Sequence, residues 1–105
     1  MKLLAVNISK LVKKDETNVD IIKDATEKAW ILNKSKLEKD LPYFVIGVSA
    51  GVIKGRFVLE KVFDDVESNR VGFLLNECNE DEESAIDIFT DGKRLKHFVV
   101  KYRWE

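Results

Sequence analysis

The sequence is poor in residues that cross-link a small fold or bind metals. It holds one cysteine, one histidine, one proline and five glycines among 105 residues. A single cysteine, Cys78, cannot form an internal disulfide, and no second cysteine or histidine stands at the spacing of a zinc site. The sequence therefore predicts a fold stabilised by its hydrophobic core, in a reducing compartment, with no metal and no cofactor.

Long apolar runs are also missing. The longest, 43–48 and 71–75, are far shorter than the roughly 20 residues that a membrane-spanning helix needs. The N-terminal residues turn polar at Asn7, which predicts no signal peptide. With 45% hydrophobic and 35% charged residues, the composition is typical of a globular chain. We expect one soluble, cytoplasmic domain over residues 1–105, with no membrane association.

Charge is segregated along the chain, although the net charge is only −1. Residues 64–92 carry ten acidic residues against one basic residue, Arg70. The near-neutral total disfavours non-specific DNA binding, which depends on neutralising many phosphates. A local basic cleft remains compatible with this distribution. The acidic region 77–91 indicates an alternative function, in which the chain is a regulatory protein that docks a basic protein partner through this region.

The first half of the chain predicts one strand and one main helix. Residues 3–8 are apolar and indicate a strand. Apolar residues then recur at three- and four-residue steps, which indicates an amphipathic helix over about 18–31. Thr17 or Asn18 is the expected N-cap of this helix, because both side chains accept hydrogen bonds from backbone amides.

The clearest local pattern is a β-hairpin. Two apolar stretches, 43–49 and 52–63, flank the dipeptide Ala50-Gly51. Gly51 can take the positive φ that a tight turn requires. Gly55, in the middle of the second stretch, predicts a bulge or the close approach of another backbone or of a ligand.

The remaining pattern predicts two further strands, over 70–76 and 98–102. Between them lie an acidic loop over 77–84 and an ambiguous segment over 85–89. The order of elements indicates an α+β fold, with a small, strongly bent antiparallel sheet or β-barrel and one main helix packed against it.

Several of these segments resemble a known superfamily. A helix ending in Ala29-Trp30 precedes Tyr43-Phe-Val-Ile-Gly-Val-Ser-Ala-Gly-Val-Ile-Lys-Gly-Arg-Phe-Val-Leu59, and Arg70-Val-Gly-Phe73 follows. This order is similar to the PUA-like superfamily, in particular its EVE-like and ASCH-like small barrels, and resembles uncharacterised bacterial and phage proteins of that type. The resemblance covers most of the chain and implies a PUA-like barrel. It also implies binding of RNA or modified nucleobases, often in an aromatic-lined pocket between helix and barrel.

The candidate ligand-binding residues are aromatic or basic. Aromatic side chains would stack on a base, and basic side chains would meet phosphate or polar edges. The residues expected to contact the ligand are Trp30, Lys34, Tyr43, Lys54, Arg56 and Arg70.

Most of these candidates have a structural alternative. Trp30 lies on the apolar face of its helix, where aromatic residues usually join the core. Lys34 fits a solvated loop equally well, and Arg70 fits a salt bridge to a neighbouring carboxylate. Lys54 and Arg56 are also explained as exposed strand charges that prevent edge pairing.

No residue spacing indicates a catalytic site. His97 has no nucleophile motif beside it, and Cys78 stands among carboxylates that are expected to raise its pKa. We therefore expect a non-enzymatic binding module for RNA, modified DNA or a nucleotide-like ligand, held in a cleft between the helix and the barrel. The exposed edges of a small sheet also allow a homodimer.

Overall fold

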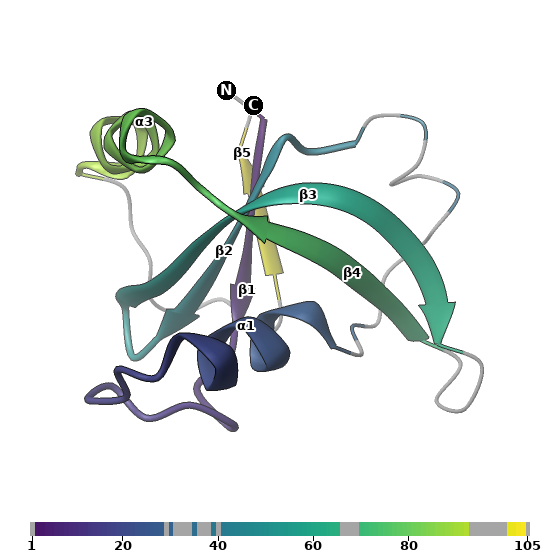
Figure 1. Cartoon of the computed structure of the whole chain (residues 1–105), viewed down its shortest axis with the longest axis horizontal. Helices are drawn as coiled ribbons and strands as arrows, with labels where there is room; N and C mark the ends of the chain where they lie inside the picture. The colour runs from purple at the N-terminus through teal and green to yellow at the C-terminus, as the bar shows by residue number, and fades with distance from the viewer. Residues whose placement is uncertain are drawn as a thin grey trace.

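The computed structural model describes residues 2–28, 30, 35, 39, 41–65, 70–92 and 101–104. The elements are β1 (Leu3–Asn7), α1 (Val19–Glu27), β2 (Phe44–Ser49), β3 (Val52–Asp65), β4 (Arg70–Glu77), α3 (Glu80–Thr90) and β5 (Lys101–Trp104). The five strands form one sheet in the order β4-β3-β2-β1-β5 (Figure 1). The predicted α+β class is confirmed.

Helix α1 begins where the sequence predicts and ends earlier. The Asn18 side chain accepts hydrogen bonds from two backbone amides of the first turn, so Asn18 is the N-cap. The helix ends at Glu27 instead of continuing to residue 31. The physical reason is that Trp30 forms an isolated antiparallel bridge with Val71, which requires an extended backbone that helical residues do not have.

The β2–β3 hairpin is confirmed. Ala50 and Gly51 both have positive φ, 52° and 80°, as a two-residue turn that matches the twist of its strands requires. The pairing shifts between Gly47–Gly55 and Val48–Ile53 and leaves one extra residue on β3. The bulge predicted at Gly55 is therefore present, and its extra residue is Lys54.

The prediction of a purely antiparallel sheet is wrong at its centre. β1 and β2 pair in parallel, in a register that aligns Leu3 with Phe44. Parallel neighbours need a crossover connection, and the segment that contains α1 supplies it. The other strand pairs are antiparallel, and β3 is strongly curved (Figure 1). Within the described residues, the edge strands β4 and β5 do not pair with each other, so the sheet is open there.

The acidic loop predicted over 77–84 is also wrong, as is the separation of 85–89 from it. Both belong to α3. Asn79 accepts a hydrogen bond from the Glu82 amide at 2.8 Å, and the Glu82 carboxylate accepts one from the Asn79 amide at 2.9 Å. This capping box starts the helix. Four acidic residues in the first turn then lie at the positive end of the helix dipole, where negative charge is favourable.

The sheet buries apolar side chains on both faces, and each face has its own helix. The α1-side core contains Leu4, Val6, Ile8, Val12, Ile22, Ala25, Trp30, Val45, Phe57, Val62, Val71, Phe73 and Leu75. The α3-side core contains Leu3, Ala5, Phe44, Ile46, Val48 and Ile86. A second helix therefore packs on the sheet, where the sequence predicts only one.

Among the described residues, no helix combines the length and the apolar character needed to cross a membrane. The strand predicted over 98–102 overlaps β5, and its residues 98–100 lie outside the described residues.

Candidate functional site

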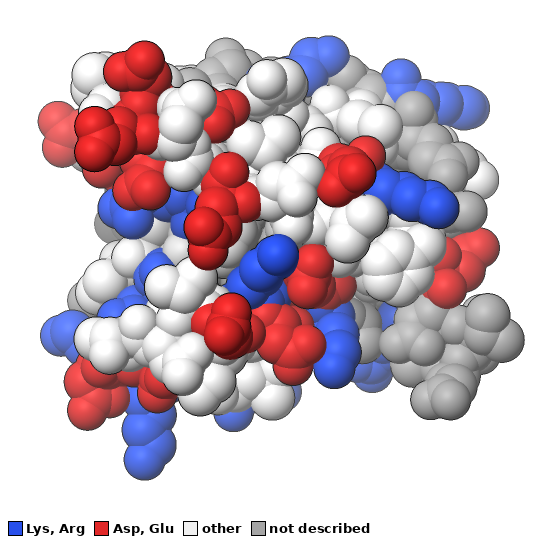
Figure 2. Space-filling model, viewed as in Figure 1, with Lys and Arg blue, Asp and Glu red and all other residues white. Residues whose placement is uncertain are grey.

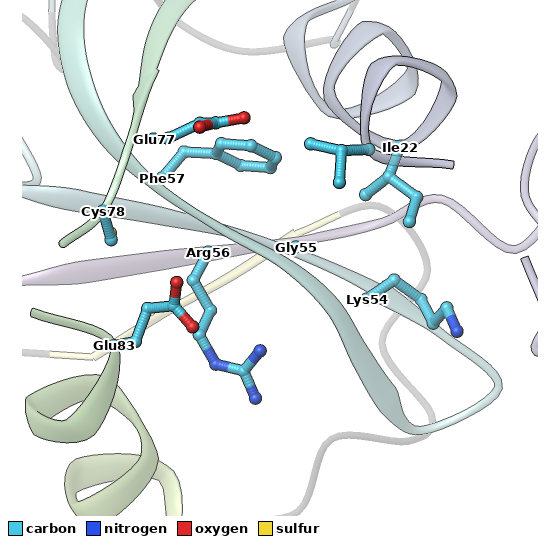
Figure 3. Close-up of a pocket in the computed structure, with 9 residues that line it drawn as sticks. Ile22, Lys54, Gly55, Arg56, Phe57, Glu77, Cys78 and Glu83 are labelled. Atoms are coloured by element: carbon cyan, nitrogen blue, oxygen red, sulfur yellow. The ribbon is translucent and has the colours of Figure 1, made fainter. Parts of the chain in front are cut away.

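A pocket of about 280 Å³ lies where β3 extends beyond the end of β4 (Figure 3). The β3–β4 pairing ends at Phe57 and Glu77, so within the described residues Val52–Arg56 pairs with β2 alone. The pocket lies at this free strand edge, between α1 and α3. Its lining residues are Val19, Ile22, Lys54, Gly55, Arg56, Phe57, Glu77, Cys78 and Glu83.

The apolar part of the lining depends on Gly55. A Cβ at this position would lie 2.7 Å from Cγ2 of Ile22 and 2.6 Å from Cε2 of Phe57, so a larger residue would force these side chains to move. The sequence predicts a bulge or the close approach of a backbone or a ligand at Gly55, whereas the groups that lie close to it are these two side chains. Figure 3 shows Ile22 and Phe57 on one side of the β3 ribbon, and Arg56 and Glu83 on the other.

Arg56 reaches from β3 to α3. Its Nε donates to Oδ1 of Asp87 at 2.7 Å, and the two side chains are 26% and 54% exposed. An ion pair this exposed adds about 0–1 kcal/mol to stability. The hydrogen bonds described for Arg56 use Nε alone, so the two terminal amino groups can donate to a ligand.

Lys54 is the bulge residue and joins the hairpin to the segment before α1. Its Nζ donates to the backbone carbonyl of Lys14 at 2.7 Å. An ammonium group has three N–H donors, so donors remain for a ligand in the pocket. Lys54 therefore lines the pocket, but Figure 3 shows its ammonium group pointing away from Arg56, toward the hairpin turn.

The other polar lining groups are acidic or neutral. Glu77 and Glu83 are exposed at the pocket. Burial raises the pKa of the Cys78 thiol from 9.0 to about 11, with smaller contributions from Glu82 and Glu83. The predicted effect of nearby carboxylates on this pKa is confirmed, although burial is the larger cause. The thiol is protonated at neutral pH and is a poor nucleophile.

The remaining predicted site residues lie elsewhere. Trp30 is 8% exposed in the α1-side core, and its indole N–H donates to the Thr26 carbonyl at 2.8 Å. Tyr43 precedes β2, is exposed, and makes an edge-on ring contact with Phe44 at 4.6 Å. Arg70 starts β4, at the end of the strand away from the pocket.

Of the predicted ligand-binding residues, the structure brings Lys54 and Arg56 together in the pocket. Lys34 lies outside the described residues, as does His97. Sequence reasoning missed Ile22, Phe57 and Glu83 as pocket residues. The spacing Asn79-x-x-Glu82 was the available signal for the helix that carries Glu83.

Within the described part of the chain, no group of three or more His, Cys, Asp or Glu side chains is placed to hold a metal ion. No protein-family model, curated protein or solved structure matches this chain.

Proposed function

We propose that this chain is a non-enzymatic binding module that takes a nucleotide-like ligand in the pocket between α1, the free end of β3 and α3. The supporting observation is that Lys54 and Arg56 line the same pocket as the apolar side chains of Ile22 and Phe57. Apolar side chains that pack against a ligand, together with polar groups that orient it, are features of small-molecule sites. The volume of about 280 Å³ is near the lower end of the range for such sites, roughly 300–1,000 Å³. It suits a nucleoside or a single base of a strand.

The proposal includes a PUA-like identity for the open, curved sheet, and a cytoplasmic setting. The resemblance of residues 43–59 to that superfamily supports both a base as ligand and a cleft beside the main helix. The base would belong to RNA, to modified DNA or to a free nucleotide. The role of Trp30 as a stacking residue is not part of this proposal, because its side chain is in the core.

The direct test is a titration followed by amide NMR, using nucleosides, nucleotides, single-stranded RNA and DNA with modified bases. We expect shifts at Gly55 and Arg56, which line the pocket. The amide of Lys61, on the same strand but outside the pocket, should stay unchanged. Absence of shifts at Gly55 with every ligand would reject the proposal.

A matched pair of variants separates the pocket from general charge effects. Arg56→Ala removes a cation from the pocket, whereas Lys61→Ala removes an exposed cation from the same strand. We expect Arg56→Ala to weaken ligand binding and Lys61→Ala to leave it unchanged. Equal weakening by both variants would indicate non-specific attraction of charge.

A second candidate function is docking of a basic protein partner on α3. Acidic side chains gather over this helix (Figure 2), and Ile88 among them is 79% exposed. A lysine-rich peptide serves as the probe, and we expect salt-sensitive binding. Neutralising Glu80, Asp81 and Glu83 should abolish it, while Glu82 stays unchanged because it belongs to the capping box. Unchanged binding in this triple variant would exclude α3 as the docking surface.

A further inference from the structure

The pocket is less positive than its two basic residues indicate. Asp87 lies 2.7 Å from Arg56 and compensates its charge from outside the pocket lining. Glu77 and Glu83 add two carboxylates to the lining itself. The acidic groups in and directly beside the pocket therefore outnumber the basic ones.

This arrangement disfavours a phosphate group. A phosphate monoester carries about −1.5 to −2 charges at neutral pH. To reach Arg56, it must compete with Asp87 for the guanidinium and lie close to Glu83, which faces the same side of β3 as Arg56 (Figure 3). Repulsion between like charges opposes both steps.

An uncharged heterocycle avoids this repulsion. With Nε held by Asp87, the terminal amino groups of Arg56 remain as a planar pair of donors. Such a pair matches two adjacent acceptors on a base edge, such as O6 and N7 of guanine. Carboxylates such as Glu77 and Glu83 accept hydrogen bonds from ring N–H and amino groups. A guanine base offers both kinds of edge.

We infer that the pocket selects an uncharged nucleoside, of which guanosine fits best, over its 5′-monophosphate, and that Asp87 sets this selectivity through its ion pair with Arg56. The inference rests on the proposed function of the pocket. The base is the part of the ligand that enters the pocket, and Asp87 is the residue that excludes phosphate. In a strand of nucleic acid, the base would enter and the backbone would stay outside.

Asp87 is a suitable position for a test because it does not line the pocket. Asp87→Asn keeps one oxygen that accepts a hydrogen bond from Arg56 Nε, removes the negative charge and replaces the other oxygen with an amide NH2 group. Asp81→Asn is the matched control, since it removes one exposed carboxylate from the first turn of the same helix. The Ile86 amide shift shows whether α3 remains packed, because Ile86 is fully buried.

The experiment compares the four ribonucleosides with their 5′-monophosphates at low salt, by calorimetry and by the Gly55 amide shift. In the parent protein, we expect guanosine to bind tighter than guanosine monophosphate by about tenfold. In Asp87→Asn, we expect monophosphate affinity to rise by about tenfold while guanosine affinity stays within about twofold. Asp81→Asn should match the parent protein.

The outcomes separate the inference from the function on which it rests. Tighter binding of monophosphates than of nucleosides by the parent protein would overturn the inference and support a pocket for nucleotides. An unchanged affinity ratio in folded Asp87→Asn would remove the role of Asp87. No shift at Gly55 with any nucleoside or monophosphate would reject the proposed small ligand itself.

Discussion

Trp30 and Val71 exchange two backbone hydrogen bonds, each of 2.8 Å. This bridge places Trp30, which follows α1, against the outer edge of β4. The Glu27 carboxylate covers the same edge by accepting a hydrogen bond from the Leu75 amide at 3.1 Å. The edge of β4 is thereby protected at two points against pairing with another chain.

Trp30 is expected to act on stability and not on binding. Trp30→Ala removes a buried aromatic ring and should lower the free energy of unfolding by about 3–5 kcal/mol. Trp30→Phe keeps most of the ring and loses the hydrogen bond to Thr26, so we expect a smaller loss, about 1 kcal/mol. Urea unfolding measures both. A Trp30→Phe variant that folds but fails to bind ligand would instead place the indole in the binding site.

Gly55→Ala should damage the pocket and the packing of α1 together. The new methyl group would overlap Ile22 and Phe57, so we expect a loss of about 1–3 kcal/mol in the free energy of unfolding and weaker ligand binding. Gly92→Ala is the control: Gly92 has φ +77° and no atom within 4 Å of a Cβ. It should cost about 1–2 kcal/mol through backbone strain alone and leave ligand affinity unchanged. Thermal unfolding and calorimetry distinguish the two cases.

Asn79→Ala should loosen α3 locally. The substitution removes the side-chain acceptor of the capping box, at an expected cost of about 1 kcal/mol. Hydrogen exchange of the α3 amides is the sensitive measurement. In Asn79→Ala, the α3 amides should exchange faster than in the parent protein, whereas the exchange of the β2 amides should not change. Glu80→Ala, in the same turn but outside the capping box, should change exchange much less. Equal effects of the two variants would argue against the capping box.

Cys78 should react slowly with alkylating agents at neutral pH. Its pKa of about 11 implies a thiolate fraction at pH 8 about a hundredfold below that of a thiol with the ordinary pKa of 9.0. Because folding raises this pKa, the protonated thiol is favoured in the folded state. The contribution of the Cys78 thiol to the free energy of unfolding is complete below pH 9 and is lost as the pH rises from 9 towards 11. Iodoacetamide rates measured against pH, folded and in urea, test the shift. Identical profiles would contradict it.

Local patterns predicted the local parts of the fold. The turn at Ala50-Gly51, the bulge beside Gly55 and the N-cap at Asn18 each depend on a few neighbouring residues, and each is present. The acidic loop predicted over 77–84 is wrong from residue 80 onward, because a run of acidic side chains resembles a solvated loop. The capping box and the dipole of a helix start make the same charges favourable.

Contacts between residues far apart in the chain could not be predicted from the sequence. The parallel pairing of β1 with β2 depends on how the crossover segment packs, which no local spacing records. The pocket exists because β4 ends at Glu77, opposite Phe57, and leaves the first residues of β3 without a neighbour on that edge among the residues that the structure describes. Helices α1 and α3 flank this part of β3. Lys54 and Arg56 were identifiable as ligand-binding candidates because they flank Gly55. Glu83 became a neighbour of Arg56 only through the tertiary fold.

The position of β1 has a consequence for how the chain folds during synthesis. β1 lies between β2 and β5, and Leu3 is aligned with Phe44 on one side and with Trp104 on the other. β1 is made before both of its partners and therefore cannot complete its pairing until residues 101–104 have been made. Such contacts between distant parts of a chain slow folding. Until then, one edge of β1 has no strand partner, and β5 supplies that partner only after the other four strands of the sheet have been made.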